Sequence, residues 1–150
     1  MTHTACELAS TGNQTIRLQD YLGQWIVLYF YPKDATPGCT TEGQNFRDAH
    51  ADFLALNTVI FGVSRDSVKS HETFKQKQQF PFDLLSDGDE ALCQQFDVIK
   101  LKNMYGKQVR GIERSTFLID PTGVIRHEWR KVKVDGHVAD VYKTLVALQK

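Results

Sequence analysis

Cys39 stands in a short stretch whose residue types could support thiol chemistry. A proline and a threonine precede it in the spacing Pro32-x-x-x-Thr36-x-x-Cys39, and Pro37-Gly38 comes directly before it. Pro37 suits the first turn of a helix, because proline lacks the amide hydrogen that would be unpaired there. A cysteine at a helix start lies near unpaired backbone N–H groups and the positive end of the helix dipole, which favour the thiolate. The sequence therefore predicts a nucleophilic thiolate at Cys39.

A thiolate alone does not make an efficient catalyst. A setting that stabilises the thiolate also lowers its intrinsic nucleophilicity, so the net gain in rate is only about a few-fold. The site must also stabilise the charge that develops in the transition state, which requires fixed hydrogen-bond donors aimed at the reacting atoms. Thr36 and the loop amides are local candidates, and an arginine from elsewhere in the chain would be the natural complement.

The elements that must position Cys39 follow an α/β plan. Residues 25–31, "WIVLYFY", form a continuous apolar and aromatic run, which predicts a strand buried on both faces. A helical pattern follows Pro37-Gly38. The further predictions are a strand at 58–64, a helix capped by Asp66 or Ser67 and ended by Pro81, a short strand at 82–87, a short helix at 89–96, a loop at 100–113, a hairpin at 115–130 and a last helix capped by Asp135. A βαβ unit followed by a ββα unit is the plan of a thioredoxin-like domain.

The stretch "YFYPKDATPGCTTE" resembles the active site of the peroxiredoxins, thiol peroxidases on a thioredoxin-like fold, and within them the bacterioferritin-comigratory, or Q-type, group. The resemblance continues through "GVSRDSV", "LLSD" and "GIERSTFLID", and it covers most of the chain from about Trp25 to Asp120. It implies an α/β, thioredoxin-like fold with a central mixed sheet flanked by helices. The length of 150 residues suggests one domain over 1–150.

The resemblance also implies a role for each matched residue. Cys39 attacks the terminal oxygen of the peroxide and becomes a sulfenic acid. Thr36 hydrogen-bonds the peroxide, Pro32 shields the pocket, and Arg114 holds the thiolate and the developing negative charge. The implied substrates are hydrogen peroxide and organic hydroperoxides, and the implied reductant is thioredoxin or a small thiol. No metal, haem or flavin is expected, and the implied oligomeric state is a monomer or weak dimer.

The chain departs from the family pattern at the second, resolving cysteine. Many Q-type members carry it five residues after the first, where this chain has Gln44, and others carry it in the following helix, where residues 67–79 contain none. Cys93, Cys6 and a thiol from another molecule remain. Cys93 lies beside Leu92 in a helix expected to pack inward, so we expect an external thiol, with Cys93 as the internal candidate.

Composition narrows the possible partners and the compartment. Eighteen basic residues balance eighteen acidic ones, which gives no reason to expect a nucleic-acid or membrane partner. No apolar run is long enough to span a bilayer, and the N-terminus lacks a signal-peptide pattern. Three cysteines fit a reducing compartment, so a cytoplasmic location is expected. The five histidines show no paired metal-ligand spacing, so no metal site is expected.

Two other functions compete with the peroxidase hypothesis. A thioredoxin-like disulfide oxidoreductase would need a C-x-x-C pair, and Glu42 stands where its second cysteine would be. A redox sensor or holdase on the same fold needs no turnover, and only activity separates it from a peroxidase.

Overall fold

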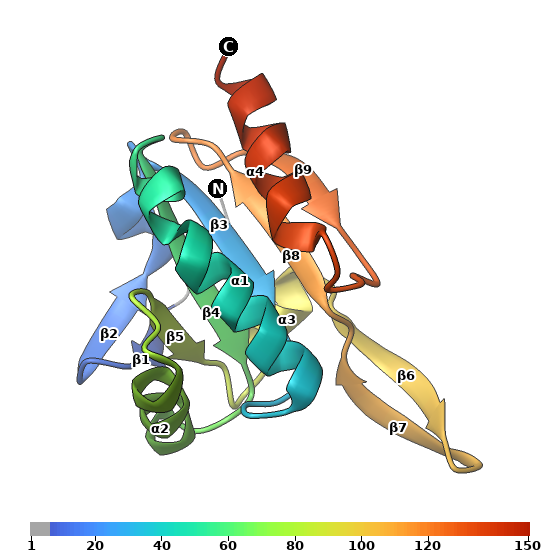
Figure 1. Cartoon of the computed structure of the whole chain (residues 1–150). Helices are drawn as coiled ribbons and strands as arrows, with labels where there is room; N and C mark the ends of the chain where they lie inside the picture. The colour runs from blue at the N-terminus through green and yellow to red at the C-terminus, as the bar shows by residue number, and fades with distance from the viewer. Residues whose placement is uncertain (1–6) are drawn as a thin grey trace.

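The computed structural model describes residues 7–150. In chain order its elements are β1 (Glu7–Ser10), β2 (Gln14–Arg17), the 3-10 helix η2 (Leu18–Tyr21), β3 (Trp25–Phe30), α1 (Pro37–Leu54), β4 (Thr58–Ser64), α2 (Val68–Gln78), β5 (Asp83–Ser86), α3 (Ala91–Gln95), β6 (Ile99–Met104), β7 (Lys107–Ile112), β8 (Ser115–Ile119), β9 (Ile125–Trp129) and α4 (His137–Leu148). Seven strands form one mixed sheet in the order β2-β1-β5-β4-β3-β8-β9, and β6 pairs only with β7 (Figure 1).

Strand β3 lies in the interior of the large sheet, between β4 and β8, and its two faces belong to two layers of the core. It pairs in parallel with β4 and antiparallel with β8, and all six of its residues are buried. Because side chains alternate along a strand, Leu28 and Phe30 enter one hydrophobic cluster, while Val27 and Tyr29 enter another on the opposite face. Helices α1, α2 and α4 contribute to the second cluster, and α3 contributes to the first. The predicted mixed sheet flanked by helices is confirmed.

Helix α1 begins at the end of the loop that follows β3. Thr36 precedes it in an extended conformation and Pro37 occupies its first turn. The amide of Thr40 donates to the carbonyl of Thr36 at 2.8 Å, which is the first hydrogen bond of the helix. Cys39 therefore lies in the first turn of α1, as its sequence context predicts.

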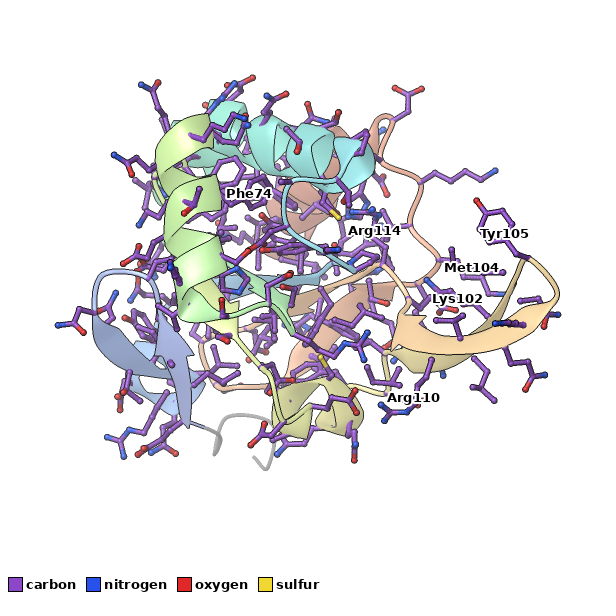
Figure 2. The ribbon with its side chains drawn as sticks, turned by 90° about the horizontal axis from the view of Figure 1, so that it is seen from below. Phe74, Lys102, Met104, Tyr105, Arg110 and Arg114 are labelled. Carbon is purple, nitrogen blue, oxygen red and sulfur yellow. The ribbon has the colours of Figure 1, made fainter. Side chains whose placement is uncertain are left out.

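The prediction of a loop at 100–113 is wrong, because this segment forms the β6–β7 hairpin. Tyr105 and Gly106, at its tip, have φ values of 54° and 79°, and two consecutive positive φ values are typical of the tight turns that join hairpin strands. The hairpin extends away from the large sheet, and the side chain of Tyr105 is 99% exposed (Figure 2). Both faces of the hairpin carry lysine, arginine or other polar residues, so apolar alternation does not reveal its strands in the sequence.

The structure confirms one predicted helix cap, contradicts another and contains a hairpin that was not predicted. Ser67 caps α2 by accepting a hydrogen bond from the amide of Ser70, which selects Ser67 over Asp66. Asp135 does not cap α4, because Gly136 takes the cap position with φ 73° and no side-chain bond is made. The β1–β2 hairpin was not predicted, because its four-residue strands are too short for a clear pattern.

Within 7–150, no helix has both the length and the apolar composition needed to cross a bilayer.

Candidate active site

Cys39 is buried beneath the amino-terminal turn of α1. Its side chain is 2% exposed and belongs to the apolar cluster that also contains Tyr29, Tyr31 and Phe46. The first backbone N–H groups of a helix have no intrahelical partner, so they add positive potential at its amino end. The sulfur of Cys39 therefore lies between the positive end of a helix and apolar side chains that limit its contact with water.

Arg114 reaches Cys39 from the connection between β7 and β8. Its Nη2 donates to the sulfur of Cys39 at 3.4 Å, and its Nη1 donates to Oε1 of Glu42 at 2.6 Å. The absence of a side chain at Gly38 permits this approach, since a Cβ there would lie 3.1 Å from Nη2. Two residues that are 75 positions apart in the chain therefore come into contact in the fold.

Glu42 completes a buried group of charges with Arg114 and Cys39. It is fully buried one helical turn after Cys39, and its Oε2 has no hydrogen-bond partner among the residues that the structure describes. Burial raises the pKa of Glu42 to about 7, against the lowering effect of Arg114. Burial lowers the pKa of Arg114, but the combined effect of Glu42 and Cys39 raises it by more. The net result is a raised pKa, so Arg114 remains a cation.

Sequence reasoning missed the contact between Glu42 and Arg114. It treated Glu42 only as evidence against a C-x-x-C pair. The available signal was the spacing, because residues three apart in a helix lie on the same face and Glu42 is three after Cys39.

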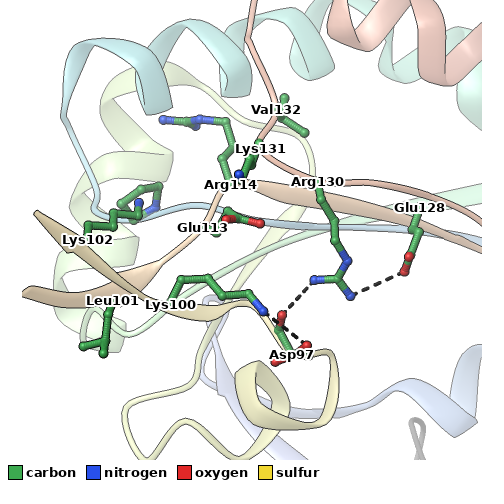
Figure 3. Close-up of a pocket in the computed structure, with 11 residues that line it drawn as sticks. Asp97, Lys100, Leu101, Lys102, Glu113, Arg114, Glu128, Arg130, Lys131 and Val132 are labelled. Carbon is green, nitrogen blue, oxygen red and sulfur yellow. Dashed lines mark hydrogen bonds and ion pairs between the residues drawn. The ribbon is translucent and has the colours of Figure 1, made fainter.

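Pro32 and Thr36 lie on the loop between β3 and α1. Pro32 and Arg114 both line an open cavity of about 1070 Å³, shown in Figure 3. Thr36 is the residue before α1, and its hydroxyl donates to the carbonyl of Lys33 at 2.8 Å. That hydrogen bond uses the hydroxyl hydrogen within the loop and leaves lone pairs on the oxygen that can accept a hydrogen bond from a substrate.

The wall of this cavity carries more cations than carboxylates. Lys100, Lys102, Arg130 and Lys131 line it together with Arg114, and the carboxylates are those of Asp97, Glu113 and Glu128. Lys100 pairs with Asp97 at 3.2 Å and Arg130 with Glu128 at 3.4 Å, as Figure 3 shows. The cavity beside Arg114 therefore has a positive balance of charge, which suits anions and polar ligands.

The structure does not bring Cys93 to Cys39. Cys93 is fully buried in α3 and belongs to the hydrophobic cluster on the other face of the sheet. Asp87 accepts hydrogen bonds from the amides of Cys93 and Leu92, at 2.7 Å and 3.1 Å. Burial, followed by the carboxylate of Asp87, raises the pKa of the Cys93 thiol well above its ordinary value. Cys93 is thus kept as a neutral, packed thiol.

Cys6 and position 44 were the other two places considered for a resolving cysteine. Cys6 lies outside the described residues. Gln44, on α1, donates through its side-chain amide to Oε1 of Gln78 at the end of α2, 2.8 Å away. A polar contact between α1 and α2 therefore stands where many Q-type members have a second thiol.

Comparison with known proteins gives a consistent set of matches. The profile of the AhpC/TSA family matches residues 3–128. Peroxiredoxin Bcp of Xanthomonas campestris is 58% identical over 140 residues, which cover 93% of this chain and 88% of that protein. Peroxiredoxin Bcp of Bacillus subtilis is 55% identical over 139 residues, with the same coverage of 93% and 88%. A solved structure of the X. campestris bacterioferritin comigratory protein, studied for its alkyl peroxide reduction activity, has a TM-score of 0.95 and 54% identity, covering 100% of this chain and 96% of that one.

Proposed function

The chain belongs to the AhpC/TSA family and is a peroxiredoxin of the Bcp, or Q, group with a thioredoxin-like fold, and we propose that Cys39 is the residue through which it reduces peroxides. A peroxiredoxin is a thiol peroxidase. The observation that carries the assignment of the site is the 3.4 Å contact between Nη2 of Arg114 and the sulfur of Cys39, at the amino-terminal turn of α1.

The proposed reaction begins with the thiolate of Cys39. Its sulfur attacks the terminal oxygen of a hydroperoxide, so an S–O bond forms as the O–O bond breaks, and the alcohol or water leaves after taking a proton. The electron pair comes from the sulfur, and Cys39 becomes a sulfenic acid. Arg114 favours this step twice, because its guanidinium stabilises the thiolate and the negative charge that develops on the breaking O–O bond.

Pro32 and Thr36 have supporting roles in this proposal. Pro32 forms part of the wall beside Arg114 and limits the access of water to the buried thiol. Thr36 accepts a hydrogen bond from the peroxide through the lone pairs that its contact with Lys33 leaves free. The substrates are hydrogen peroxide and organic hydroperoxides.

The second half of the cycle uses an external thiol, with thioredoxin as the proposed physiological donor. One thiol attacks the sulfenic acid and releases water, and a second thiol then frees Cys39 as the donor becomes a disulfide. The position of Cys93 in the other hydrophobic cluster and the presence of glutamine at residue 44 support an external donor. A cytoplasmic location and a monomeric or weakly dimeric state stay predictions.

The test is to measure peroxide consumption with hydrogen peroxide and an alkyl hydroperoxide, using thioredoxin or a small thiol as reductant. We expect multiple turnovers in the wild type, and mass spectrometry after one equivalent of peroxide should show a single added oxygen on Cys39. A disulfide oxidoreductase would instead reduce insulin disulfides, and a sensor would be oxidised without turnover. Either of those results would replace the proposed function.

A further inference from the structure

A buried group of hydrogen bonds holds the loop that carries Pro32 and Thr36 and is not used by the reaction described above. Its centre is Asp34, which stands in the loop between Pro32 and Thr36 and is 7% exposed. The hydroxyl of Tyr31 donates to its Oδ1 at 2.6 Å. The hydroxyl of Ser70, on α2, donates to its Oδ2 at 2.8 Å. The carboxyl group of Asp34 therefore joins the loop to α2.

His71, the next residue of α2, adds a further bond to this connection. It is fully buried, with Nδ1 2.7 Å from Oδ2 of Asp34 and Nε2 2.9 Å from the carbonyl of Leu85 in β5. A carbonyl can only accept, so Nε2 must carry a hydrogen. One further proton lies between Nδ1 and Oδ2, whether the imidazolium donates to a carboxylate or a carboxylic acid donates to a neutral ring. In both forms the two side chains are bonded, and neither is free to turn.

The backbone of Asp34 is held as well. Its amide donates to Oδ2 of Asp66 at 2.9 Å, and the same oxygen accepts a hydrogen bond from the hydroxyl of Ser64 at 2.5 Å. The hydroxyl of Ser86 donates to the carbonyl of Asp66 at 2.6 Å. The loop is therefore fixed to the carboxyl ends of both β4 and β5.

These bonds hold a backbone conformation that the sequence does not favour. Ala35, which follows Asp34, has φ 63°, in the left-handed region where a residue with a Cβ is strained. Such conformations persist only where the surrounding structure enforces them. Asp34 on one side and the bond from Thr36 to Lys33 on the other enclose this residue.

The same cluster has the residue types of a metal site, but its bonding favours a different role. Ligand atoms of Asp34, Asp66 and His71 lie within 4.8 Å of one another. Oδ2 of Asp34, Oδ2 of Asp66 and both ring nitrogens of His71 already have hydrogen-bonding partners within the protein, and a cation at these atoms would have to displace them. The set is complete as a hydrogen-bonded network.

We propose that Asp34 and His71 are positioning residues for peroxide reduction. They fix the loop in the shape that places Pro32 at the cavity wall and Thr36 at the start of α1. They touch neither Cys39 nor Arg114 through any hydrogen bond in the described structure, and they act only through the loop. The inference rests on the proposed function of Cys39.

The test measures the second-order rate constant for oxidation of Cys39 by hydrogen peroxide in stopped-flow experiments, in reduced protein and without turnover. Asp34→Ala and His71→Ala should each lower this constant by about tenfold, because a misplacement of about 1 Å can cost about a hundredfold in rate and the remaining bonds of the loop keep the displacement smaller than that. Asp34→Asn should recover most of the loss. Its amide oxygen can accept from Tyr31, and its NH₂ group can donate to Nδ1 of a neutral His71 and to Ser70.

A control separates positioning from general loss of stability. Leu92→Ala opens a cavity in the hydrophobic cluster on the other face of the sheet and destabilises the fold without touching the loop. It should keep the wild-type rate constant at temperatures where it is folded. An equal fall in rate for Leu92→Ala, or no rescue by Asp34→Asn, would overturn the proposal.

A milder variant keeps the proposal testable where the alanine variants of Asp34 and His71 do not fold. Ser70→Ala removes one hydrogen bond to Asp34 from a half-buried position, and it should lower the rate constant by about threefold. A wild-type constant in Ser70→Ala and in the folded alanine variants would show that the network is structural only. If the wild type itself fails to consume peroxide, the proposed function fails instead, and the two failures are thus distinguishable.

Discussion

Cys39 and Cys93 are both buried thiols in helices, and they differ in the charge placed beside them. Cys39 lies in the first turn of an 18-residue helix with the guanidinium of Arg114 3.4 Å from its sulfur. Cys93 lies in a five-residue helix whose backbone amides are bonded to the carboxylate of Asp87. Both thiols are buried, so the difference lies in the neighbouring charge: a cation beside Cys39 favours a nucleophilic thiolate, and a carboxylate beside Cys93 favours a neutral, inert thiol.

The sheet also keeps the two thiols apart. The residues of β3 point alternately into the cluster that contains Cys39 and the cluster that contains Cys93. A disulfide requires Cα atoms within about 7 Å, which two side chains packed on opposite faces of a sheet do not satisfy without unfolding. Helix position and neighbouring charge, more than burial, therefore distinguish the reactive cysteine from the packed one.

Among substitutions at the two thiols and their neighbours, replacement of Cys39 should have the largest effect on peroxide consumption. Cys39→Ser should abolish peroxide consumption and leave the fold intact, because a serine hydroxyl stays protonated and is a poor nucleophile at neutral pH. Peroxide consumption and circular dichroism measure the two properties. Normal turnover in this variant would assign the chemistry to another residue.

Arg114→Ala should produce the next largest effect. Loss of one donor that stabilises developing charge costs about a hundredfold in rate in comparable sites, so the oxidation of Cys39 should slow by about that factor. Lys131→Ala is the matched control, because Lys131 lines the same cavity without an observed bond to Cys39. Equal losses in the two variants would mean that Arg114 acts only through the overall charge of the cavity.

Glu42→Gln should have a moderate effect that depends on pH. Burial raises the pKa of Glu42 from 4.5 to about 7 in the folded protein. The unfolded chain therefore releases this proton first, so the contribution of Glu42 to stability declines as the pH rises from about 4.5 to about 7. Glutamine cannot ionise, and its oxygen can still accept from Arg114, so the variant should lack this decline.

Urea denaturation at about pH 5 and about pH 8 measures that difference in stability. The rate constant for oxidation of Cys39 should also vary less with pH in Glu42→Gln, because no second negative charge develops beside Arg114. Glu72→Gln, at an exposed position on α2, is the control. A pH dependence in Glu42→Gln identical to that of the wild type would show that Glu42 does not titrate in this range.

Cys93→Ser should have the smallest effect. With a small-thiol reductant its turnover should stay within about twofold of the wild type, because a thiol kept neutral and packed takes no part in the cycle. The wild type should also be over-oxidised to the sulfinic acid when peroxide exceeds reductant, since no internal thiol captures the sulfenic acid. An intramolecular Cys39–Cys93 disulfide, with turnover lost in Cys93→Ser, would overturn this view of the two thiols.

Elements with strong local signals could be predicted, and those with weak signals could not. The buried strand at β3 and the strand over Thr58–Ser64 have continuous apolar runs, and the hairpin at β8 and β9 surrounds a Pro-Thr-Gly turn. The β6–β7 hairpin was missed, because its exposed strands are rich in basic and polar residues. The start of α4 was misassigned, because Gly136 adopts a conformation that composition alone does not distinguish from a side-chain cap at Asp135.

Local patterns in the sequence were enough to predict the setting of Cys39: a cysteine after a proline and a glycine, at the junction of a buried strand and a helix. That information is local, since it depends on the conformational limits of proline and on hydrophobic runs within a few residues. The resemblance to the peroxiredoxins also implied that Arg114 contacts the thiolate. The pairing of Glu42 with Arg114, the network of Asp34 with His71, and the packing of Cys39 and Cys93 on opposite faces of the sheet follow only from the folded structure, because they depend on how strands pair and which face each side chain takes. Those choices minimise exposed apolar area and unpaired polar groups over the whole chain, so no single stretch contains them.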